Sequence, residues 1–484
     1  MIDILFVNPP TPSPDEHAGY EMNAPPLGIG YLAALLLDNG YKIAVAELAF
    51  ENSPTLALMD KLHQTEPRIV AFYTTTVNYY VTERLLNSVR REHPEAITWV
   101  GGPHVSYEYE TALNDSGFDV VFIFEAEHTV VPVARAQLQG QGKLEDIPGI
   151  AFRRNGHVVK TPPMARENNL DQFPFPARDL FPMTKYTRPG SIMSSRGCPY
   201  KCIFCIASTF EDAYRHRSPA NVVAELEDMY RRWGINDFYF VDNVFTTHAD
   251  RAREICRLIR EADLPIGWYC VSRVDYATPE LMQEMASAGC YRVELGVESG
   301  DPQVINGMNK HITLEQVYRA ANIILNLGMQ PMFTFQVGHP HDTLSSIEAT
   351  LHLAERVQEL GAGAYLSVTT PYPGAPMMIN REQYGICLET TNWEEYRWSN
   401  PTFSTPNFSR NDVRVALYRG AASMARSIAE GKFKDPLSAP WLRFGSAGNG
   451  YKLPPPPNPV STDTADLPDT KGSRVGPSFQ QVEK

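Results

Sequence analysis

The chain has no run of about 18 uninterrupted apolar residues, the length a membrane-spanning helix needs, so we expect no membrane span. Basic residues are also few: 43 Lys and Arg stand against 56 Asp and Glu, which gives a net charge of −13. Because nucleic-acid binding needs a basic surface, this balance argues against a nucleic-acid partner. The first residues, Met1 to Asn8, have no basic segment before their apolar run and are typical of a β-strand, not of a signal peptide.

Cysteine is rare as well, with seven residues in 484. An odd number of scattered cysteines does not suit a disulfide framework, so we expect a reduced, cytoplasmic protein. The length predicts about two or three domains.

Three of these cysteines stand together at Cys198, Cys202 and Cys205, in a C-x3-C-x2-C spacing. Three thiolates on one loop can hold three irons of a [4Fe–4S] cluster and leave the fourth iron open to a small molecule. A structural zinc loop is the alternative, but zinc sites usually have four ligands in two pairs, and no second pair lies nearby in the sequence. Phe204, directly before the last cysteine, would shield a cluster from water.

Residues 1–135 alternate short apolar runs with helical patterns, such as those at 27–36 and 81–91. Strands are expected at residues 2–8, 43–46, 69–73, 97–101 and 120–124. This alternation predicts an α/β domain of the doubly wound, Rossmann-like type, in which ligands lie beyond the carboxyl ends of the parallel strands. The proline-rich residues 136–190 are expected to form a linker with a small hairpin near 149–159.

A second alternating series occupies residues 191–384. Strands are expected just before Cys198 and at residues 238–241, 266–271, 292–295, 332–337 and 365–369. Six strand–helix units predict a partial (β/α)6 barrel with its site at the carboxyl ends of the strands. Residues 385–452 predict a small, mainly helical cap that would help to close the barrel mouth, with a helix from about Ser409 to Glu430. Residues 453–484 are proline-rich and polar, so this tail is expected to be disordered.

Several short segments, in this order and spacing, resemble those of the cobalamin-binding radical S-adenosylmethionine (SAM) enzymes over about residues 1–450. Residues 101–104 resemble the G-G-x-H turn of a cobalamin-type domain, and residues 173–179 resemble the linker before the barrel. Residues 214–219, 295–300 and 371–376 also fall where that family has its motifs. The resemblance implies three cofactors: a [4Fe–4S] cluster, SAM, which the cluster cleaves to a 5′-deoxyadenosyl radical, and cobalamin as a methyl carrier.

The resemblance also implies roles for residues of the barrel. The candidates for SAM binding are Phe204 beside the cluster, Asp242 and Asn243 for the ammonium group, Arg273 for the carboxylate, Glu298 and Ser299 for the ribose hydroxyls, and Val337 and Gly338 for the adenine. A plain turn is the alternative for Asp242 and Asn243, and a surface ion pair for Arg273. His339 and Tyr372 are candidates for contact with the substrate.

Candidates for cobalamin binding lie at the strand ends of the first domain: Pro9, Thr74, Thr75, Thr76, Gly101, Gly102, His104, Ser106 and Glu125. The D-x-H-x-x-G loop that supplies a cobalt ligand in some relatives is absent. Asp15 and His17 give D-x-H, but glycine is the second residue after His17 and not the third, so His17 is not expected to bind cobalt. Residues 124–127 read F-E-A-E where the family commonly has G-E-G-E, which restricts backbone approach to the corrin.

The favoured hypothesis is a cobalamin-dependent C-methyltransferase that acts on an unactivated carbon of a small molecule, with a one-electron reductant such as flavodoxin or ferredoxin as partner. The alternative is a radical SAM oxidoreductase, cyclase, dehydratase or epimerase whose first domain does not use cobalamin for methyl transfer. A non-enzymatic iron–sulfur protein is a third hypothesis. Residues 107–110 are expected to form a solvated turn. Tyr79 and Tyr80 could line the corrin face or serve packing at the head of a helix. Trp393, Tyr396 and Trp398 could contact a substrate, but a packing role is favoured.

Overall fold

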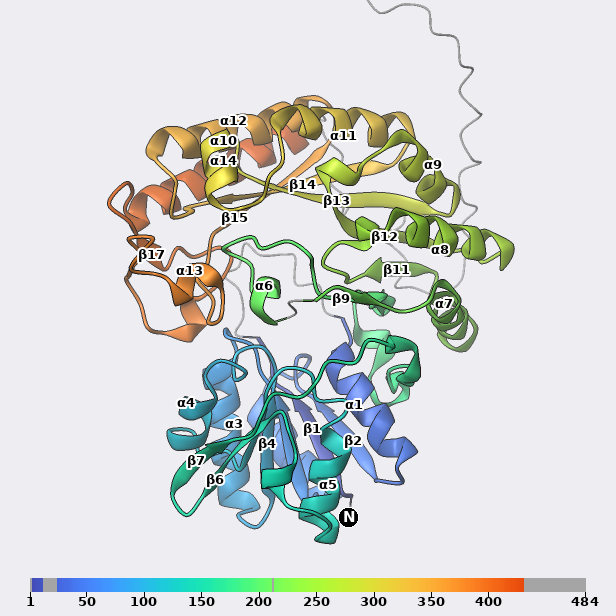
Figure 1. The fold of residues 1–484 in the computed structure, drawn as a ribbon, viewed down its shortest axis with the longest axis vertical. Helices are drawn as coiled ribbons and strands as arrows, with labels where there is room; N and C mark the ends of the chain where they lie inside the picture. The colour runs from blue at the N-terminus through green and yellow to red at the C-terminus, as the bar shows by residue number, and fades with distance from the viewer. Residues whose placement is uncertain (1, 12–23, 211–212, 431–484) are drawn as a thin grey trace, which may run out of the picture. The chain divides into compact units, whose positions relative to one another are not determined.

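Seven strands form the first sheet of this computed structural model, which describes residues 2–11, 24–210 and 213–430. Their spatial order is β2-β1-β3-β4-β5-β6-β7, with β1 to β5 parallel and the last two antiparallel (Figure 1). The strands are β1 Ile4–Asn8, β2 Ile43–Glu47, β3 Ile69–Tyr73, β4 Ile97–Gly101, β5 Val120–Phe122, β6 Ile150–Arg154 and β7 His157–Lys160. Asp15, His17 and the tail 453–484 lie outside the described residues.

Alternation along β1 explains why helices cover both faces of this sheet. Ile4 and Phe6 belong to the core that includes Ile29, while Leu5 and Val7 belong to the core on the other face that includes Leu86. The helices are α1 Leu27–Asp38, α2 Pro54–Thr65, α3 Tyr79–Glu92, α4 Tyr109–Asn114 and α5 Val130–Gln139. The predicted doubly wound domain is confirmed.

The hairpin near residues 149–159 forms as expected, but it does not belong to a linker. β6 pairs with β5, so the sheet continues to Lys160 instead of ending near residue 135. The pairing satisfies the free edge of β5, which has only three residues. Between β7 and the second sheet, the described chain has only short 3-10 turns, at Leu170–Gln172, Arg178–Leu180 and Met183–Lys185.

The second sheet has six strands, all parallel, in the order β15-β14-β13-β12-β11-β8, and it confirms the predicted partial barrel. The strands are β8 Ser191–Ile192, β11 Asp237–Phe240, β12 Gly267–Arg273, β13 Cys290–Glu298, β14 Gln330–Val337 and β15 Gly363–Val368. Because β8 and β15 are the two edges, the described sheet does not close into a ring. β9 Ser195–Arg196 and β10 Arg215–His216 form a separate antiparallel pair on either side of the cysteine loop.

Helices connect and cover the six strands (Figure 1). They are α6 Ala207–Phe210, α7 Pro219–Trp233, α8 Ala249–Glu261, α9 Pro279–Ser287, α10 Pro302–Gly307, α11 Leu314–Asn326, α12 Leu344–Glu359 and α13 Pro376–Ile379. Ser218 caps α7 by accepting a hydrogen bond from the Asn221 N–H, and proline follows at the first helical position.

The predicted helical cap is only partly helical. Residues 385–405 include two short antiparallel strands, β16 Cys387–Leu388 and β17 Phe403–Ser404, and a 3-10 turn at Trp393–Glu395. The long helix α14 Arg410–Ala429 forms as expected, but it packs along α12 and β15. Gly420 permits this contact, because a Cβ there would lie 2.3 Å from the Leu366 side chain. α14 therefore extends the barrel wall, and the residues from 431 onward lie outside the described chain.

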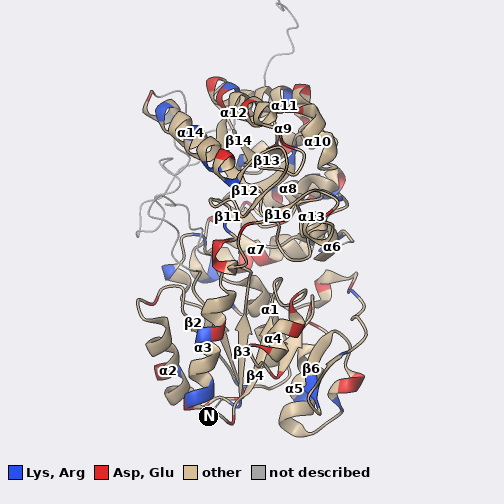
Figure 2. Ribbon diagram, turned by 90° about the vertical axis from the view of Figure 1, so that its left-hand side faces the viewer, with Lys and Arg blue, Asp and Glu red and all other residues tan. Residues whose placement is uncertain are grey.

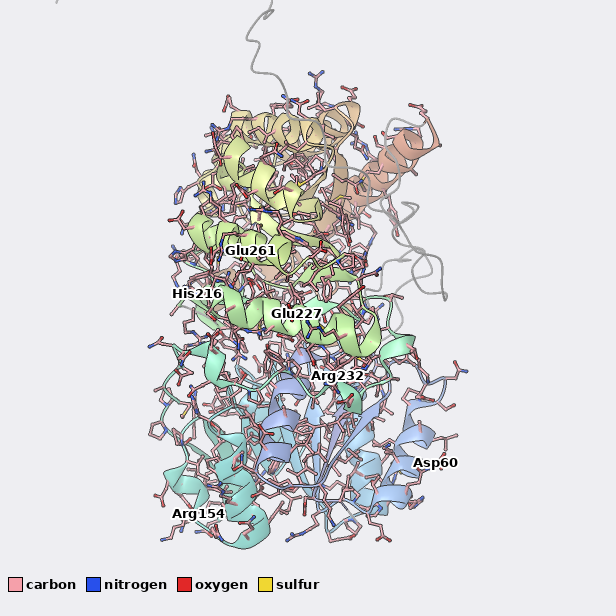
Figure 3. All side chains as sticks on the ribbon, turned by 90° about the vertical axis from the view of Figure 1, so that its right-hand side faces the viewer. Asp60, Arg154, His216, Glu227, Arg232 and Glu261 are labelled. Atoms are coloured by element: carbon pink, nitrogen blue, oxygen red, sulfur yellow. The ribbon has the colours of Figure 1, made fainter. Side chains whose placement is uncertain are left out.

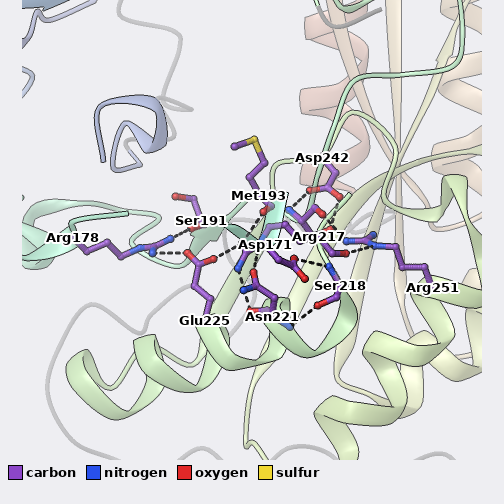
Figure 4. Close-up of polar contacts among 11 residues, drawn as sticks. Asp171, Arg178, Ser191, Met193, Arg217, Ser218, Asn221, Glu225, Asp242 and Arg251 are labelled. Atoms are coloured by element: carbon purple, nitrogen blue, oxygen red, sulfur yellow. Dashed lines mark hydrogen bonds and ion pairs between the residues drawn. The ribbon is translucent and has the colours of Figure 1, made fainter. Parts of the chain in front are cut away.

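A buried ionic network fixes the start of the barrel (Figure 4). Glu225 of α7, with no exposed side-chain surface, accepts hydrogen bonds from Arg178 at 2.6 Å and from Arg217. Burial by itself would raise the pKa of Glu225, but the two guanidinium groups outweigh it and lower the pKa. Arg178 also donates to the carbonyl of Ser191 in β8 at 2.9 Å. The network therefore ties the connecting segment, β8 and α7 together.

Charged residues at the surface are interspersed in sign, as Figure 2 shows for one side of the molecule. Figure 3 labels Glu227 and Arg232 on α7, and both take part in exposed ion pairs, with Arg231 and Asp179 respectively. Pairs of this kind contribute little to stability, because water screens them. Within the described residues, no helix is long and apolar enough to cross a membrane.

Gly102 lies directly against the end of the neighbouring strand in the first sheet. Its φ is +124°, and a Cβ there would lie 2.2 Å from the carbonyl oxygen of Thr74. We expect Gly102→Ala to lower the free energy of unfolding by about 3 kcal/mol, because backbone strain and the clash add. Urea unfolding would measure the loss.

Gly28→Ala is the matched control for this substitution. A Cβ at Gly28 meets nothing within 4 Å, and the residue lies in α1 without a left-handed backbone. This variant should be as stable as the wild type or slightly more so. An equal loss in both variants would contradict the account of Gly102.

Candidate functional site

The cysteine loop lies between β9 and α6 and is held by backbone hydrogen bonds from distant parts of the barrel. The Ile203 N–H donates to the Met308 carbonyl at 3.1 Å, and the Met377 N–H donates to the Ile203 carbonyl at 2.9 Å. The Asn309 side-chain amide donates to the Lys201 carbonyl at 2.9 Å. These contacts come from the segments after α10 and β15, so residues far away in the sequence hold the loop in its conformation.

The three thiols are largely buried. Burial raises the pKa of Cys198 and Cys202 and raises that of Cys205 to about 11. Thiolates that bind iron therefore need the positive charge of the metal to stabilise them. In the described part of the chain, no three His, Cys, Asp or Glu side chains converge on a site for a single metal ion. In a [4Fe–4S] cluster each thiolate binds its own iron, so convergence on one point is not required.

Arg273, at the end of β12, lies against the cysteine loop. Its guanidinium carbon is 3.7 Å from the ring centroid of Tyr200, and it donates to both carboxylate oxygens of Asp275, at 2.9 and 3.2 Å. It also donates to the Lys310 carbonyl at 2.8 Å. Arg273 is therefore buried at the strand end, as the sequence predicts, and is not a surface ion pair. Its contact with SAM stays a prediction.

Lys310 is a site residue that the sequence analysis did not identify. Its Nζ lies 2.6 Å from Oε1 of Glu298, and both side chains are only 7% exposed. Gly296 makes room for this pair, because a Cβ there would lie 2.5 Å from the Glu298 carboxylate and 2.7 Å from Nζ. Lys310 lies in a loop after α10, where a single lysine gives no sequence signal. The backbone of Glu298, with φ of +73°, turns the carboxylate toward this loop.

Two buried polar groups at this edge have no partner among the described residues: Oε2 of Glu298 and both ring nitrogens of His339. The His339 ring lies 5.3 Å from that of Phe204, and the Lys310 ammonium lies 6.0 Å from the same ring. Because buried polar atoms are normally hydrogen-bonded, these unsatisfied atoms fit a ligand that binds beside the cysteine loop. Burial lowers the pKa of His339 to about 3, so its imidazole is neutral at pH 7.

Other predicted SAM residues are engaged with the protein. Asp242 accepts from the N–H of Ser194 at 2.7 Å and from the hydroxyls of Ser194 and Ser195 at 2.5 Å, so it supports the chain just before the cysteine loop (Figure 4). Asn243 beside it is exposed. The Ser299 hydroxyl lies 3.2 Å from that of Thr350 in α12, on the helix side of the sheet. The sequence analysis did not foresee these partners.

The turn after β14 is shaped by one carboxylate. Asp342 accepts from the backbone N–H of Gly338 and His339 at 2.9 and 2.8 Å, and from the Ser346 hydroxyl at 2.6 Å. Burial raises the pKa of Asp342 to about 6. The Val337 carbonyl accepts from Thr369. Tyr372, a substrate candidate, donates to the Tyr396 carbonyl at 3.1 Å.

The strand ends of the first sheet bring the predicted cobalamin candidates together. His104, 1% exposed, packs between Tyr79 at 4.5 Å and Trp393 at 5.2 Å between ring centroids. Its Nδ1 lies 3.3 Å from the Thr76 hydroxyl, while Nε2 is buried without a partner among the described residues. Pro9, Thr74, Thr75, Gly101 and Ser106 lie at this same edge, after β1, β3 and β4. The Thr74 hydroxyl donates to the Asn78 side chain and the Ser106 hydroxyl to the Gly102 carbonyl, so the unsatisfied His104 nitrogen is the group that fits a ligand here.

One candidate at this edge already has protein partners, and one expectation is wrong. Glu125 forms hydrogen bonds with Arg215 of β10 and lies 3.4 Å from Arg196 of β9, and its contact with cobalamin stays a prediction. Tyr107 does not lie in a solvated turn, since its hydroxyl donates to Thr209 of α6 at 2.8 Å and its ring packs on Gly374. Both residues connect the first sheet to the barrel, a contact that no local sequence pattern reports.

Comparisons with known proteins identify the two parts of the chain. A family model for the radical SAM superfamily matches residues 192–354, and a model for the B12-binding domain matches residues 18–134. The chain belongs to the B12-binding radical SAM family. It is therefore an enzyme of the radical SAM type. The radical SAM match implies a [4Fe–4S] cluster and SAM, and the B12-binding match implies cobalamin.

Individual relatives agree with this family. The radical SAM chain is 29% identical over 432 residues to an uncharacterised methyltransferase of Pyrococcus horikoshii, covering 87% of this chain and 92% of the relative. It is 27% identical over 426 residues to an anaerobic magnesium-protoporphyrin IX monomethyl ester cyclase of Rubrivivax gelatinosus, covering 85% and 75%. The fold resembles that of TsrM, a radical SAM methyltransferase from Kitasatospora setae, with a TM-score of 0.69, 19% identity, and coverage of 86% and 90%.

Lys310→Met should lower the free energy of unfolding by about 3 kcal/mol or more, because it leaves the Glu298 carboxylate buried without its counter-ion. Glu298→Gln combined with Lys310→Met removes both charges and should recover much of the loss. Urea unfolding measures both. Arg419→Met, which breaks an exposed pair with Glu348, is the control and should cost about 1 kcal/mol or less. A double variant as unstable as Lys310→Met would contradict the pairing.

His104 should make stability depend on pH. Burial lowers its pKa to about 3, whereas that of an unfolded histidine is about 6.5. The unfolded chain therefore binds the proton more tightly, and stability is lost as pH falls from about 6.5 toward 3. Between pH 7.5 and 4.5, the free energy of unfolding of His104→Asn should fall by about 2 kcal/mol less than that of the wild type. Urea midpoints at the two pH values measure this, with His157→Asn, at an exposed residue of β7, as control.

Proposed function

We propose that this enzyme is a cobalamin-dependent radical SAM C-methyltransferase that acts on an unactivated carbon of a small-molecule intermediate. When bound, the cluster would supply the electron that cleaves SAM to methionine and a 5′-deoxyadenosyl radical, and cobalamin would carry a methyl group from a second SAM to the substrate radical. One observation carries the proposal: a cysteine loop with unsatisfied polar atoms beside it stands in the same chain as a B12-binding domain. The similarity to the Pyrococcus methyltransferase over most of both chains supports it.

The residues of the barrel would bind SAM in stated roles. Cys198, Cys202 and Cys205 would hold the cluster, with Phe204 against it. Glu298 offers a free carboxylate oxygen to hydroxyl donors such as those of ribose, and Lys310 and Arg273 place two positive charges where a carboxylate could bind. His339 offers a neutral imidazole to SAM or to the substrate.

The residues of the first sheet would bind cobalamin at its carboxyl edge. Thr75 and Thr76 supply hydroxyls there, and His104 supplies the unsatisfied ring nitrogen. Thr74 and Ser106 would shape this edge through their hydrogen bonds to Asn78 and Gly102. A one-electron reductant such as flavodoxin or ferredoxin would supply the electron. A location in the cytoplasm suits a cluster that needs reducing conditions.

The second candidate is a radical SAM enzyme with another outcome, such as cyclisation, in which cobalamin does not transfer a methyl group. The similarity to the Rubrivivax cyclase favours this candidate. S-adenosylhomocysteine distinguishes the two, because only methyl transfer from SAM produces it.

Anaerobically reconstituted protein, given SAM, hydroxocobalamin and titanium(III) citrate, should form both 5′-deoxyadenosine and S-adenosylhomocysteine. Cys202→Ser should lose the cluster absorbance and reduce 5′-deoxyadenosine by roughly 100-fold or more, because the electron has no route into SAM. Cys387→Ser, at an exposed cysteine outside the loop, is the control and should behave as the wild type. Liquid chromatography measures both products. Deoxyadenosine without S-adenosylhomocysteine would refute methyl transfer.

A further inference from the structure

Five charged side chains from distant parts of the chain meet beside the cysteine loop. We call them the junction cluster: Glu125, Glu127, Arg166, Arg196 and Arg215. The two glutamates follow β5 of the first sheet, Arg166 comes from the segment after β7, and the two other arginines belong to β9 and β10. Each of these five charged groups already has a partner in the protein, so none of them needs a cofactor as its counter-charge.

The contacts within the junction cluster are close and largely buried. Arg215 donates two hydrogen bonds to the Glu125 carboxylate, one of them at 2.9 Å, and Arg196 donates to Glu127 at 2.6 Å. Nη1 of Arg196 and of Arg166 lie 3.4 and 3.5 Å from Glu125. Burial opposes ionisation of Glu125, but the arginines outweigh it and lower its pKa. Paired guanidinium and carboxylate groups fix both distance and orientation.

The junction cluster lies next to the cysteine loop that would hold the iron–sulfur cluster. Arg196 precedes Cys198 by two residues, and β9 and β10 frame the loop between them. On the other side, Glu125 and Glu127 belong to the loop between β5 and α5 of the B12-binding domain. A change in these ion pairs would therefore shift one domain against the other at the point where their cofactors must meet.

Phe124, next to Glu125, shows that this loop is held under strain. Its φ is +64°, a left-handed conformation that costs an L-residue roughly 1 kcal/mol. Its ring packs on Tyr107 at 5.6 Å and on Phe210 of α6 at 5.3 Å. This conformation places an aromatic contact on the helix that follows the cysteine loop. Such strain persists only where the neighbours hold it.

A cavity of about 250 Å³ borders the junction cluster and is lined by residues including Phe124, Glu125, Glu127, Arg166 and Thr209. Beside this cavity, the ion pairs and the Phe124 contact bridge the first sheet and the barrel.

We propose that the junction cluster positions the B12-binding domain against the cysteine loop, so that SAM in the barrel and cobalamin on the first sheet lie within reach of each other. The five residues are positioning residues and touch no reacting atom. The proposal rests on the proposed function, because alignment matters only if a methyl group passes between the two cofactors.

Hydrogen exchange of the reconstituted enzyme tests the alignment without any turnover. Arg215→Met removes two hydrogen bonds to Glu125, and Glu127→Gln removes the pair with Arg196. In each variant, amides of residues 123–129 and 194–197 should exchange together, roughly tenfold faster than in the wild type. Glu348→Gln, at an exposed pair on α12, should change neither segment. Unchanged exchange in both variants would overturn the proposal.

Product ratios give a readout that a loss of stability alone would not move. With SAM, hydroxocobalamin and titanium(III) citrate, Arg215→Met should form S-adenosylhomocysteine roughly tenfold more slowly or worse, because a misplacement of about 1 Å can cost 100-fold. Its 5′-deoxyadenosine formation, which needs only the barrel, should stay within about twofold. Arg215→Lys keeps the charge but loses the pair of parallel hydrogen bonds, so its rate of S-adenosylhomocysteine formation should lie between those of the wild type and Arg215→Met. An equal loss of both products, or of neither, would overturn the proposal.

The stability control is Arg90→Met, which removes hydrogen bonds to Thr98, Gly117 and Asp119 near the amino ends of β4 and β5, away from the junction cluster, and should leave the product ratio unchanged. If the wild type forms deoxyadenosine but no S-adenosylhomocysteine, the proposed function fails. Hydrogen exchange still decides the positioning role in that case.

Discussion

The pairing of the buried Glu225 carboxylate with two arginines is the interaction on which the start of the barrel depends. A carboxylate buried away from water is tolerated only because Arg178 and Arg217 neutralise it. Loss of either the carboxylate or the arginines would leave a buried charge without its counter-ion. Arg217 continues the network to the Met193 carbonyl, and Arg251 donates to the carbonyls of Ser194 and Arg217. Asp242 then binds Ser194 and Ser195. The short β8 and β9 would otherwise have too few backbone hydrogen bonds to position the cysteine loop.

From this start, the parallel sheet places its polar groups by a general rule: the carboxyl ends of all six strands meet at one edge. Arg273, Glu298 and the turn at Gly338 come from three neighbouring strands and face one loop. In the first sheet, the threonines and His104 likewise lie at the carboxyl ends of the parallel strands. What joins the two edges is different in kind. It is a set of specific contacts, namely the junction cluster, the Tyr107 hydroxyl on Thr209 and the ring of Trp393 on His104.

Much of the fold could be predicted because its signals are local. Apolar runs separated by helical periods indicated both parallel sheets and six barrel strands, and the spacing of Cys198, Cys202 and Cys205 indicated the cluster. The errors arose where pairing is non-local. The strands β6 and β7 were expected in a linker, although their own hairpin was recognised, because nothing in residues 150–160 states which sheet edge they meet. Lys310 was missed because its role depends on its contact with Glu298. A bulge in β13 and the left-handed backbone of Glu298 turn that carboxylate toward Lys310.

The sequence by itself determined the two α/β parts and the family, and it predicted the cluster ligands, since these depend on periodicity, spacing and motifs along the chain. Only the tertiary structure decided which charged groups are free for ligands and which hold the protein together. Glu125 and Asp242 have the same carboxylate chemistry as Glu298, yet the first two are occupied by arginines or serines and the third keeps an unsatisfied oxygen. The physical reason is that hydrogen-bond satisfaction is a property of neighbours in space, which the order of residues does not specify.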